Sequence, residues 1–268
     1  MIELPVFNPD IFVLAGFLHI KWYGFMYVLG FLSAWILAKK RIEECDIDLD
    51  GLLDYFTYFA MGIVIGGRVG YVLFYNYTFF LSNPWSIFEI WKGGMAFHGA
   101  LIGGLIAVLA FSMSRGVSFF SLVDLTVPLL PPGLMFGRLG NFINGELWGR
   151  VTSVPWAMIF PHSDGLPRHP SQLYAMIGEG VLLFVLLSFH RNRNQSGSGI
   201  LGAWFLIHYG WIRFFIEFFR EPDEHIGFVL FDAFSLGQCF CFIMFLCGLS
   251  WLLLSQFCKK DLKGQYSY

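Results

Sequence analysis

Residues 122–150 read LVDLTVPLLPPGLMFGRLGNFINGELWGR, and the character of this stretch changes abruptly after Phe136. Residues 122–136 are mostly apolar, a pattern that predicts contact with lipid. Residues 137–150 then hold two arginines, two asparagines, one glutamate and four glycines. Polar groups at the edge of a lipid-facing run are costly unless they serve a function, so the change predicts a functional site at a membrane boundary.

The residue types in this motif suit a phosphate. If the helix continues, Arg138, Asn141 and Asn144 fall on one face at i, i+3 and i+6. An arginine fork with flanking amide donors matches phosphate oxygens, and the glycines leave backbone N–H groups open for an anion. The alternative is that the arginine snorkels to the interface while the glycines pack helices. Clustering with Glu146 favours the binding site.

The composition of the whole chain indicates a membrane protein. Its 268 residues are 56% hydrophobic and 13% charged, whereas a soluble domain carries about 25% charged residues. The net charge of −2 argues against a nucleic-acid partner. The sequence has no HExxH, paired CxxC or Walker lysine motif, so we expect no metal and no other cofactor. The N-terminus lacks a basic region before an apolar core, so we expect no cleaved signal peptide.

The apolar segments predict an all-α fold: one membrane domain over residues 1–268, with seven transmembrane helices and a small extracytoplasmic head. The head is expected at residues 139–170, the longest weakly apolar segment. Three prolines interrupt the fourth span, and a broken helix is tolerated only where protein or a cavity covers the freed backbone groups. The spans are expected at residues 22–38, 55–75, 96–113, 119–136, 172–189, 199–218 and 228–257.

Basic residues indicate the orientation of these spans. They follow the first, third, fifth and seventh spans, so the positive-inside rule places the N-terminus outside and the C-terminus in the cytoplasm. The residues behind this assignment are Lys39, Lys40, Arg41, Arg115, Arg191, Arg193, Lys259, Lys260 and Lys263. The basic residues that topology does not explain are functional candidates: Lys21, Arg68, Lys92, Arg138, Arg150, Arg168, Arg213 and Arg220.

A single histidine, His98, lies in GGMAFHGALIGG at the outer start of the third span. A lone membrane histidine often has a packing or interfacial role. The glycines on both sides weaken that interpretation, because they open room beside the ring.

Four charged residues recur at helical spacing near the outer end of the sixth span: Arg213, Glu217, Arg220 and Glu224. They form one stripe on a helix, which is also the pattern of a structural ion-pair ladder. Arg220 is expected at the same depth as Arg138, and two arginines on separate helices would clamp a lipid phosphate. Asp124 and Glu179 are candidate partners for Arg68 or Arg213, and the sequence leaves their pairing open.

The pattern G-R-x-G-N-F-x-N-x-E-x-x-G over residues 137–149 resembles the signature of the bacterial prolipoprotein diacylglyceryl transferase family. The resemblance extends in order over nearly the whole chain. The W-Y-G triplet that contains Tyr23 resembles the first-helix motif of the family, and the segment around His98 resembles its histidine–glycine motif. Residues 220–223 resemble its R-x-P-D motif, and residues 169–174 resemble a segment outside its catalytic centre.

This resemblance implies a multi-pass enzyme of the bacterial plasma (inner) membrane whose site faces the outer leaflet. Such enzymes move the diacylglyceryl group of phosphatidylglycerol to the lipobox cysteine thiol in the signal peptide of a prolipoprotein. The products are a thioether and glycerol 1-phosphate, and the reaction is the first step of lipoprotein maturation. The implied partners are phosphatidylglycerol, the prolipoprotein and membrane lipids, and the implied cofactors are none.

The residues and the resemblance together predict a site. The expected catalytic residues are His98, Arg138, Arg220, Tyr23 and Glu146. The expected phospholipid-binding residues are Arg138, Asn141, Asn144, Arg220 and Gly149, with Glu217 and Glu224 in support. Two other functions are compatible with such a chain. A transporter would show two similar halves and polar residues near the bilayer midplane, and a non-catalytic lipid-binding scaffold would keep Arg138 without needing His98.

Overall fold

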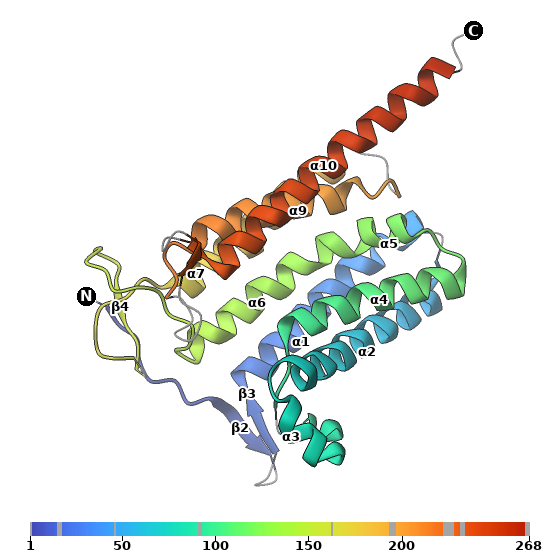
Figure 1. Cartoon of the computed structure of the whole chain (residues 1–268). Coiled ribbons are helices and arrows are strands. Elements are labelled where there is room, and N and C mark those ends of the chain that lie inside the picture. The colour runs from blue at the N-terminus through green and yellow to red at the C-terminus, as the bar shows by residue number, and fades with distance from the viewer. Residues whose placement is uncertain are drawn as a thin grey trace. The chain divides into compact units, whose positions relative to one another are not determined.

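The computed structural model describes residues 2–14, 18–45, 47–90, 93–161, 163–192, 197–221, 228–230 and 234–265 (Figure 1). These residues are mostly helical, as the sequence predicts. The chain divides into two compact units. The first unit comprises Met1–Leu37 and Thr126–Tyr268, and the second comprises Ala38–Leu125.

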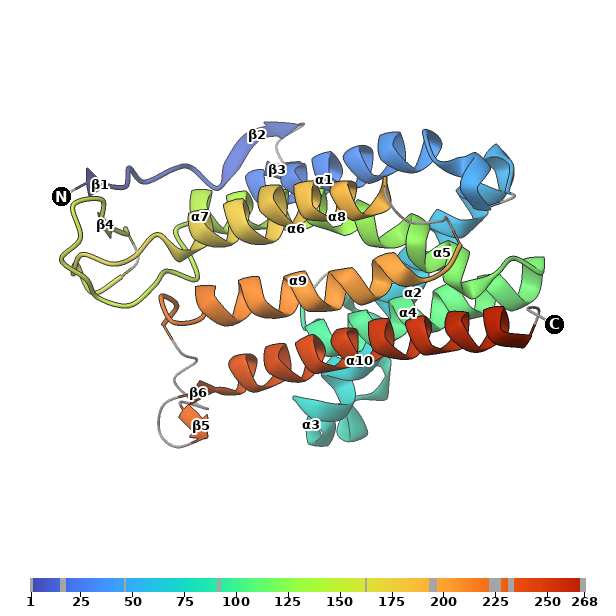
Figure 2. The same ribbon diagram turned by 90° about the horizontal axis from the view of Figure 1, so that it is seen from above.

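The first unit holds the helices that carry the polar motif. Helices α9 and α10 lie side by side along much of their length (Figure 2), and α6 packs against the π-helical segment η5. A short 3-10 turn at Pro128, η4, leads directly into α6, so the helix changes its winding where proline removes a donor. The elements are α1 (Trp22–Lys39), η4 (Val127–Leu129), α6 (Leu130–Ile143), α7 (Ser171–Ala175), η5 (Met176–Leu182), α8 (Leu183–Arg191), α9 (Ile200–Ile216) and α10 (Leu236–Gln265).

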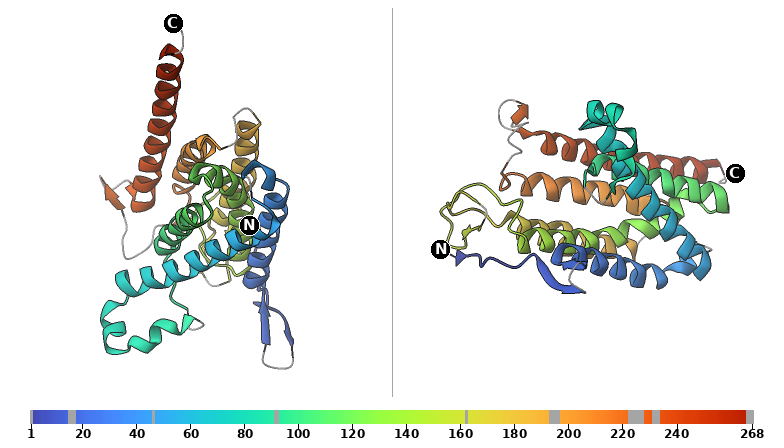
Figure 3. Two further views of the ribbon diagram at one scale, coloured as in Figure 1. Left: turned by 90° about the vertical axis from the view of Figure 1, so that its right-hand side faces the viewer. Right: turned by 90° about the horizontal axis from the view of Figure 1, so that it is seen from below.

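Among the described residues, three two-stranded sheets accompany these helices, a feature that the sequence did not predict. The N-terminal strand pairs in parallel with a strand of the loop after α6, so the N-terminus lies against that loop (Figure 1). A second sheet is a hairpin that leads into α1 (Figure 3). The pairs are β1 (Ile2–Glu3) with β4 (Met158–Ile159), β2 (Asp10–Leu14) with β3 (Leu18–Lys21), and β5 (Phe228–Leu230) with β6 (Phe234–Ser235).

The second unit is organised around a close helix pair, α2 and α4. Glycines at Gly62, Gly66 and Gly103 bring the two backbones together, because a Cβ at any of them would collide with the facing helix. The elements are η1 (Ile42–Cys45), α2 (Leu49–Phe74), α3 (Tyr77–Ser82), η2 (Pro84–Phe88), α4 (Phe97–Arg115) and α5 (Phe119–Thr126).

Arg68 of α2 is buried, and backbone carbonyls accept its hydrogen bonds. Its Nε donates to the carbonyl of Ile87 at 2.8 Å, and Nη1 donates to Gly93 at 2.6 Å and Gly94 at 3.0 Å. The guanidinium therefore holds the segment between α3 and α4. The sequence left open whether Asp124 or Glu179 pairs with Arg68, and in the structure the guanidinium donates to these backbone carbonyls.

Among the described residues, four helical segments are long and apolar enough to cross a membrane: Leu49–Phe74, Phe119–Ile143, Ser171–Arg191 and Leu236–Ser255. The apolar helices Gly99–Arg115 and Ile200–Ile216 are shorter. On α10, Phe242, Ile243 and Leu254 are exposed. Large apolar side chains at the surface suit contact with lipid.

Several helix ends differ from the predicted spans, and two of these differences bear on the polar motif and its surroundings. The fourth span was expected to end at Phe136, whereas α6 continues to Ile143 and therefore carries Arg138 and Asn141. The seventh span was expected to begin at Phe228, whereas α10 begins at Leu236. The cause is a capping box: Gln238 N–H donates to Ser235 Oγ at 3.3 Å, and Ser235 N–H donates to Gln238 Oε1 at 2.9 Å.

Candidate active site

Helix α6 directs Arg138 toward a carboxylate on the neighbouring segment η5. Its Nε and Nη2 both donate to Glu179 Oε2, each at 3.3 Å. Glu179 has no exposed surface, although it lies in an otherwise apolar segment. A buried ionised carboxylate requires partners, so this contact is a structural necessity for Glu179 as well as an anchor for Arg138.

A second arginine reaches the same carboxylate from α9. Arg213 Nη1 donates to Glu179 Oε1 at 2.8 Å, and its Nη2 lies 2.7 Å from Glu217 Oε2. Glu179 belongs to the π-helical segment η5, a winding that is rare and frequent at functional sites. One buried glutamate thus joins guanidinium groups from two helices.

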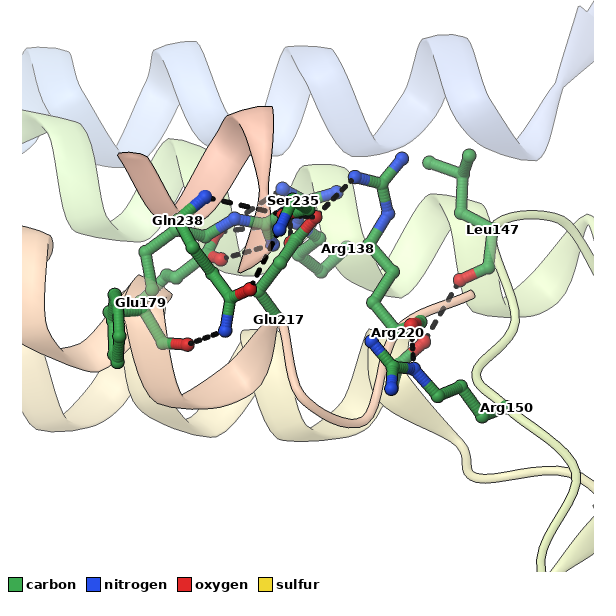
Figure 4. A network of polar contacts seen from close by, with 11 residues as sticks. Arg138, Leu147, Arg150, Glu179, Glu217, Arg220, Ser235 and Gln238 are labelled. Carbon is green, nitrogen blue, oxygen red and sulfur yellow. Dashed lines mark hydrogen bonds and ion pairs between the residues drawn. The ribbon is translucent and has the colours of Figure 1, made fainter. Parts of the chain in front are cut away.

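The chain of charges continues from Arg213 through Glu217 to Arg220. Its Nη1 donates to Glu217 Oε1 at 3.3 Å, and Ser235 Oγ donates to the same oxygen at 3.3 Å. Figure 4 shows this network, which links the last turns of α9 to the capped start of α10. The order along it is Arg138, Glu179, Arg213, Glu217 and Arg220.

Among themselves, these five residues carry three positive and two negative charges. Buried ion pairs contribute little net stability, because desolvation offsets their attraction. Such a set of charges is therefore better suited to binding an anion than to holding a fold.

A small cavity borders the network. Its volume is about 10 Å³, which is roughly the room of one water molecule. Its polar lining comprises Arg138, Ser171, Gln172, Arg213 and Arg220.

The loop after α6 folds around Glu146. Asn141 Nδ2 donates to Glu146 Oε1 at 2.9 Å, and Asn144 Nδ2 donates to the same oxygen at 3.3 Å. The next residue, Leu147, has φ of 58°. Such left-handed backbone is strained for a branched side chain, and strain of this kind clusters at functional sites. Both asparagines thus hold Glu146, and the predicted donation of their amides to phosphate is untested.

Gly149 lies where three segments of backbone meet. Its N–H donates to His169 O at 2.9 Å, and the following N–H, of Arg150, donates to Phe219 O at 2.9 Å. A Cβ at Gly149 would collide with the carbonyl oxygen of Phe219 and lie 2.7 Å from that of His169. The side chain of Arg150 also donates through Nε to Arg220 O at 2.9 Å. The glycine therefore permits the junction that fixes the backbone of Arg220.

The family model for prolipoprotein diacylglyceryl transferase matches residues 9–254 of this sequence. The chain belongs to this family. The resemblance predicted from residues 137–149 is therefore confirmed.

Relatives with a function in their names align over nearly their full length. A phosphatidylglycerol–prolipoprotein diacylglyceryl transferase from Oleidesulfovibrio alaskensis is 49% identical, over 98% of this chain and 97% of its own. A protein of the same name from Methylococcus capsulatus is 46% identical, over 97% of this chain and 100% of its own. Another from Legionella pneumophila is 47% identical, over 94% of this chain and 98% of its own.

Tyr23 of α1 packs on the same helix as Arg138. A Cβ at Gly140 would lie 2.9 Å from the Tyr23 ring, so the ring rests on the backbone of α6. The Tyr23 hydroxyl lies 3.2 Å from that of Tyr27. The ring thus lies beside the polar motif, and its predicted catalytic role stays a prediction.

Two predicted site residues lie outside the described side chains. His98 is the second residue of α4, in the second unit, and its side chain is not among those described. Glu224 lies outside the described residues. Their predicted roles in the family chemistry stay predictions.

The predicted site did not include three residues that the structure brings to the network or its cavity: Gln172, Glu179 and Arg213. The sequence had offered Glu179 as a possible partner of Arg213 and left the pairing open. Glu179 carried a usable signal, since an ionisable residue within an apolar span indicates a functional site by default. Gln172 carried none, because its segment reads as an ordinary helix start.

The loop after α6 also carries a polar cluster at its outer edge. Arg168 donates to both carboxylate oxygens of Asp164, at 3.1 and 2.9 Å, and to Glu221 at 2.9 Å. The hydrogen bond from Arg168 lowers the pKa of Asp164, and burial lowers the pKa of His169. These contacts stabilise the loop on the segment that follows α9.

Proposed function

We propose that this chain transfers the diacylglyceryl group of phosphatidylglycerol to the cysteine thiol of a prolipoprotein, the first step of lipoprotein maturation. The observation that carries this proposal is the near full-length similarity, at 46–49% identity, to relatives named for that reaction. Three guanidinium groups in the lining of one cavity support it independently, because the lipid donor carries a phosphate.

The reaction exchanges one bond for another. The cysteine sulfur bonds to the terminal glyceryl carbon, and the bond from that carbon to the phosphate oxygen breaks. The bonding electrons leave with glycerol 1-phosphate, so negative charge grows on the phosphate in the transition state. Arg138 and Arg220, which line the cavity, stabilise that charge. Fixed guanidinium groups in a water-poor site do this far better than mobile solvent, because they need no reorganisation.

The thiol must lose its proton during this step. A free thiol has a pKa of about 8.5, so it needs only modest help from a base near neutral pH. We assign that base to His98. Glu146 and Tyr23 complete the catalytic set, with Asn141 and Asn144 holding Glu146 in place. Gly149 serves lipid binding through the backbone junction that fixes Arg220.

The proposed function also implies a location in the plasma membrane, with seven spans and an outer head at residues 139–170. The pairing of β1 with β4 supports a head and an N-terminus on one side. Helix α10 has 30 residues, a length of about 45 Å. The start of this helix is hydrogen-bonded to Glu217 near the head. A hydrocarbon core is about 30 Å thick, so a helix of this length that starts at the head reaches the opposite side of the membrane.

The test is purified protein mixed with phosphatidylglycerol and a lipobox peptide, followed by mass spectrometry. The peptide should gain one diacylglyceryl group, and glycerol phosphate should appear in equal amount. A peptide with serine in place of the cysteine is the matched control and should stay unmodified. Binding of the lipid without any lipidated peptide would instead favour a scaffold, and solute movement across vesicles without product would favour a transporter.

A further inference from the structure

Gln172 holds a buried acceptor that has no partner in the part of the chain that the structure describes. Its side chain is 2% exposed, and Nε2 donates to the backbone carbonyl of Glu146 at 2.7 Å. A carbonyl only accepts, so this contact determines which end of the amide is nitrogen. Oε1, the other end, accepts no hydrogen bond from any described residue. Buried polar atoms normally have a hydrogen-bond partner. A buried acceptor that lacks one therefore indicates a binding position for a donor from outside the chain.

The surroundings of this acceptor are rich in donors and in positive charge. Gln172 lines the same cavity as the guanidinium groups of Arg138, Arg213 and Arg220. Guanidinium groups donate and never accept. Ser171 lies beside them, and its hydroxyl already donates to Leu147 O at 3.0 Å. The donors of this lining suit the oxygens of a phosphate, whereas a hydrogen-bond donor finds its acceptor at Gln172.

We propose that Gln172 Oε1 accepts a hydrogen bond from a hydroxyl of the glycerol head group of the donor lipid. This inference rests on the proposed function and adds the residue that recognises the head group. The hydroxyls lie on the leaving glycerol phosphate, close to the phosphate that the arginines bind. A neutral hydroxyl fits the position because the cavity lining already holds three guanidinium groups. A cationic head group, such as an ammonium, would be repelled there.

The consequence is discrimination against lipids without a head-group hydroxyl. Such a lipid binds its phosphate normally and leaves the acceptor of Gln172 unpaired. A site built to bond a hydroxyl rejects an analogue that lacks it for this reason. The preference should therefore depend on the oxygen of Gln172 and on no other part of the side chain.

The experiment compares phosphatidylglycerol with phosphatidylpropanol of the same acyl chains, whose head group has no hydroxyl. The quantity is the ratio of kcat/KM for the two lipids, with a lipobox peptide as acceptor. Gln172→Met removes the oxygen, and the ratio should fall about tenfold, the effect of one neutral hydrogen bond. Gln172→Glu is the matched control. Both variants lose the bond from Nε2 to Glu146, but the glutamate keeps an acceptor oxygen, so it should keep most of the preference.

Each ratio is measured within one protein preparation, so incomplete folding of a variant affects both lipids equally. An unchanged ratio in Gln172→Met would overturn the inference. So would an equal fall in Gln172→Met and Gln172→Glu, because the lost bond to Glu146 would then explain it. If the unaltered protein lipidates no peptide with phosphatidylglycerol, the proposed function fails instead. If it is active but shows no preference between the lipids, only the role of Gln172 fails.

Discussion

Both Nε and Nη2 of Arg138 donate to one oxygen of Glu179, a carboxylate with no exposed surface. The arginine predicted to bind phosphate is therefore held by a partner from another helix. The second oxygen of that carboxylate accepts a hydrogen bond from Arg213. This arrangement orients one guanidinium through another, which is what an anion site needs.

Glu179→Gln should destabilise the protein and nearly abolish activity. The amide cannot neutralise two guanidinium groups, and breaking a buried ion pair by removing one partner costs about 3–5 kcal/mol. Thermal unfolding in detergent measures the first effect, and peptide lipidation measures the second. Glu221→Gln is the control, because its contact with Arg168 is exposed and such a pair contributes less than about 1 kcal/mol. Equal melting temperatures for the two variants would contradict a central role of Glu179.

Arg138→Lys should keep the charge and lose most of the activity. An ammonium cannot copy a fork that bonds a carboxylate and a phosphate together. Loss of one stabilising donor typically lowers kcat by about a hundredfold or more. Arg115→Lys offers a comparison, since Arg115 pairs with Asp54 at the exposed surface of the second unit. Near-normal lipidation by Arg138→Lys, at normal abundance in the membrane, would remove Arg138 from the phosphate clamp.

The positions of the helices and the identity of the polar motif were predictable, because apolar runs and residue types are local properties of a sequence. Arg138 and Arg220 were expected to lie at one depth, and both line one cavity. The sequence offered Glu179 as a possible partner of Arg213, but it could not decide the pairing. Glu179 and Arg213 are 34 residues apart, and only the packing of η5 against α9 decides that they meet.

The asparagines show a second limit of sequence reasoning. Helical spacing correctly placed Asn141 on the same helix as Arg138, and Asn144 caps that helix. Helical spacing could not show that the amides of Asn141 and Asn144 have an acceptor within the protein, which competes with the predicted phosphate. Glu146 lies only two residues beyond Asn144, and the turn at Gly145 brings its carboxylate back to both amides.

The topology has its own test. The N-terminus is expected outside, on the side of the head that β1 joins, and the C-terminus is expected in the cytoplasm. Single cysteines in short tags at the two ends should therefore react differently with a membrane-impermeant thiol reagent in intact cells. The N-terminal tag should be labelled and the C-terminal tag protected until the membrane is opened. The same labelling at both ends would contradict an odd number of spans.

His98→Gln separates two roles of the histidine. If His98 takes the thiol proton, the variant should lose rate at neutral pH, and the loss should shrink as pH rises. More of the thiol, with a pKa of about 8.5, ionises without help at high pH. The measurement is lipidation at saturating phosphatidylglycerol from about pH 6 to 9, a range that brackets this value. A defect of constant size across that range would assign His98 to lipid orientation or packing.

Gly149→Ala should lower both stability and activity, although it adds a single methyl group. That methyl would meet the carbonyl oxygens of Phe219 and His169, which are backbone atoms of the junction and cannot rotate away. The backbone segments of the junction must move apart, and the hydrogen bonds that hold the backbone of Arg220 are then lost. Overpacking of this kind costs about 1–3 kcal/mol.

Gly137→Ala in the same motif is the matched control. Its Cβ would meet nothing within 4 Å, and alanine in a helix is favoured over glycine by about 0.8–1.0 kcal/mol. Gly137→Ala should therefore melt at the same temperature as the unaltered protein or slightly higher, while Gly149→Ala melts lower. A double variant, Gly149→Ala with Arg220→Lys, should lose little more activity than Arg220→Lys alone, because both changes act on one guanidinium. Fully additive losses would mean that Gly149 acts on the reaction by a route other than Arg220.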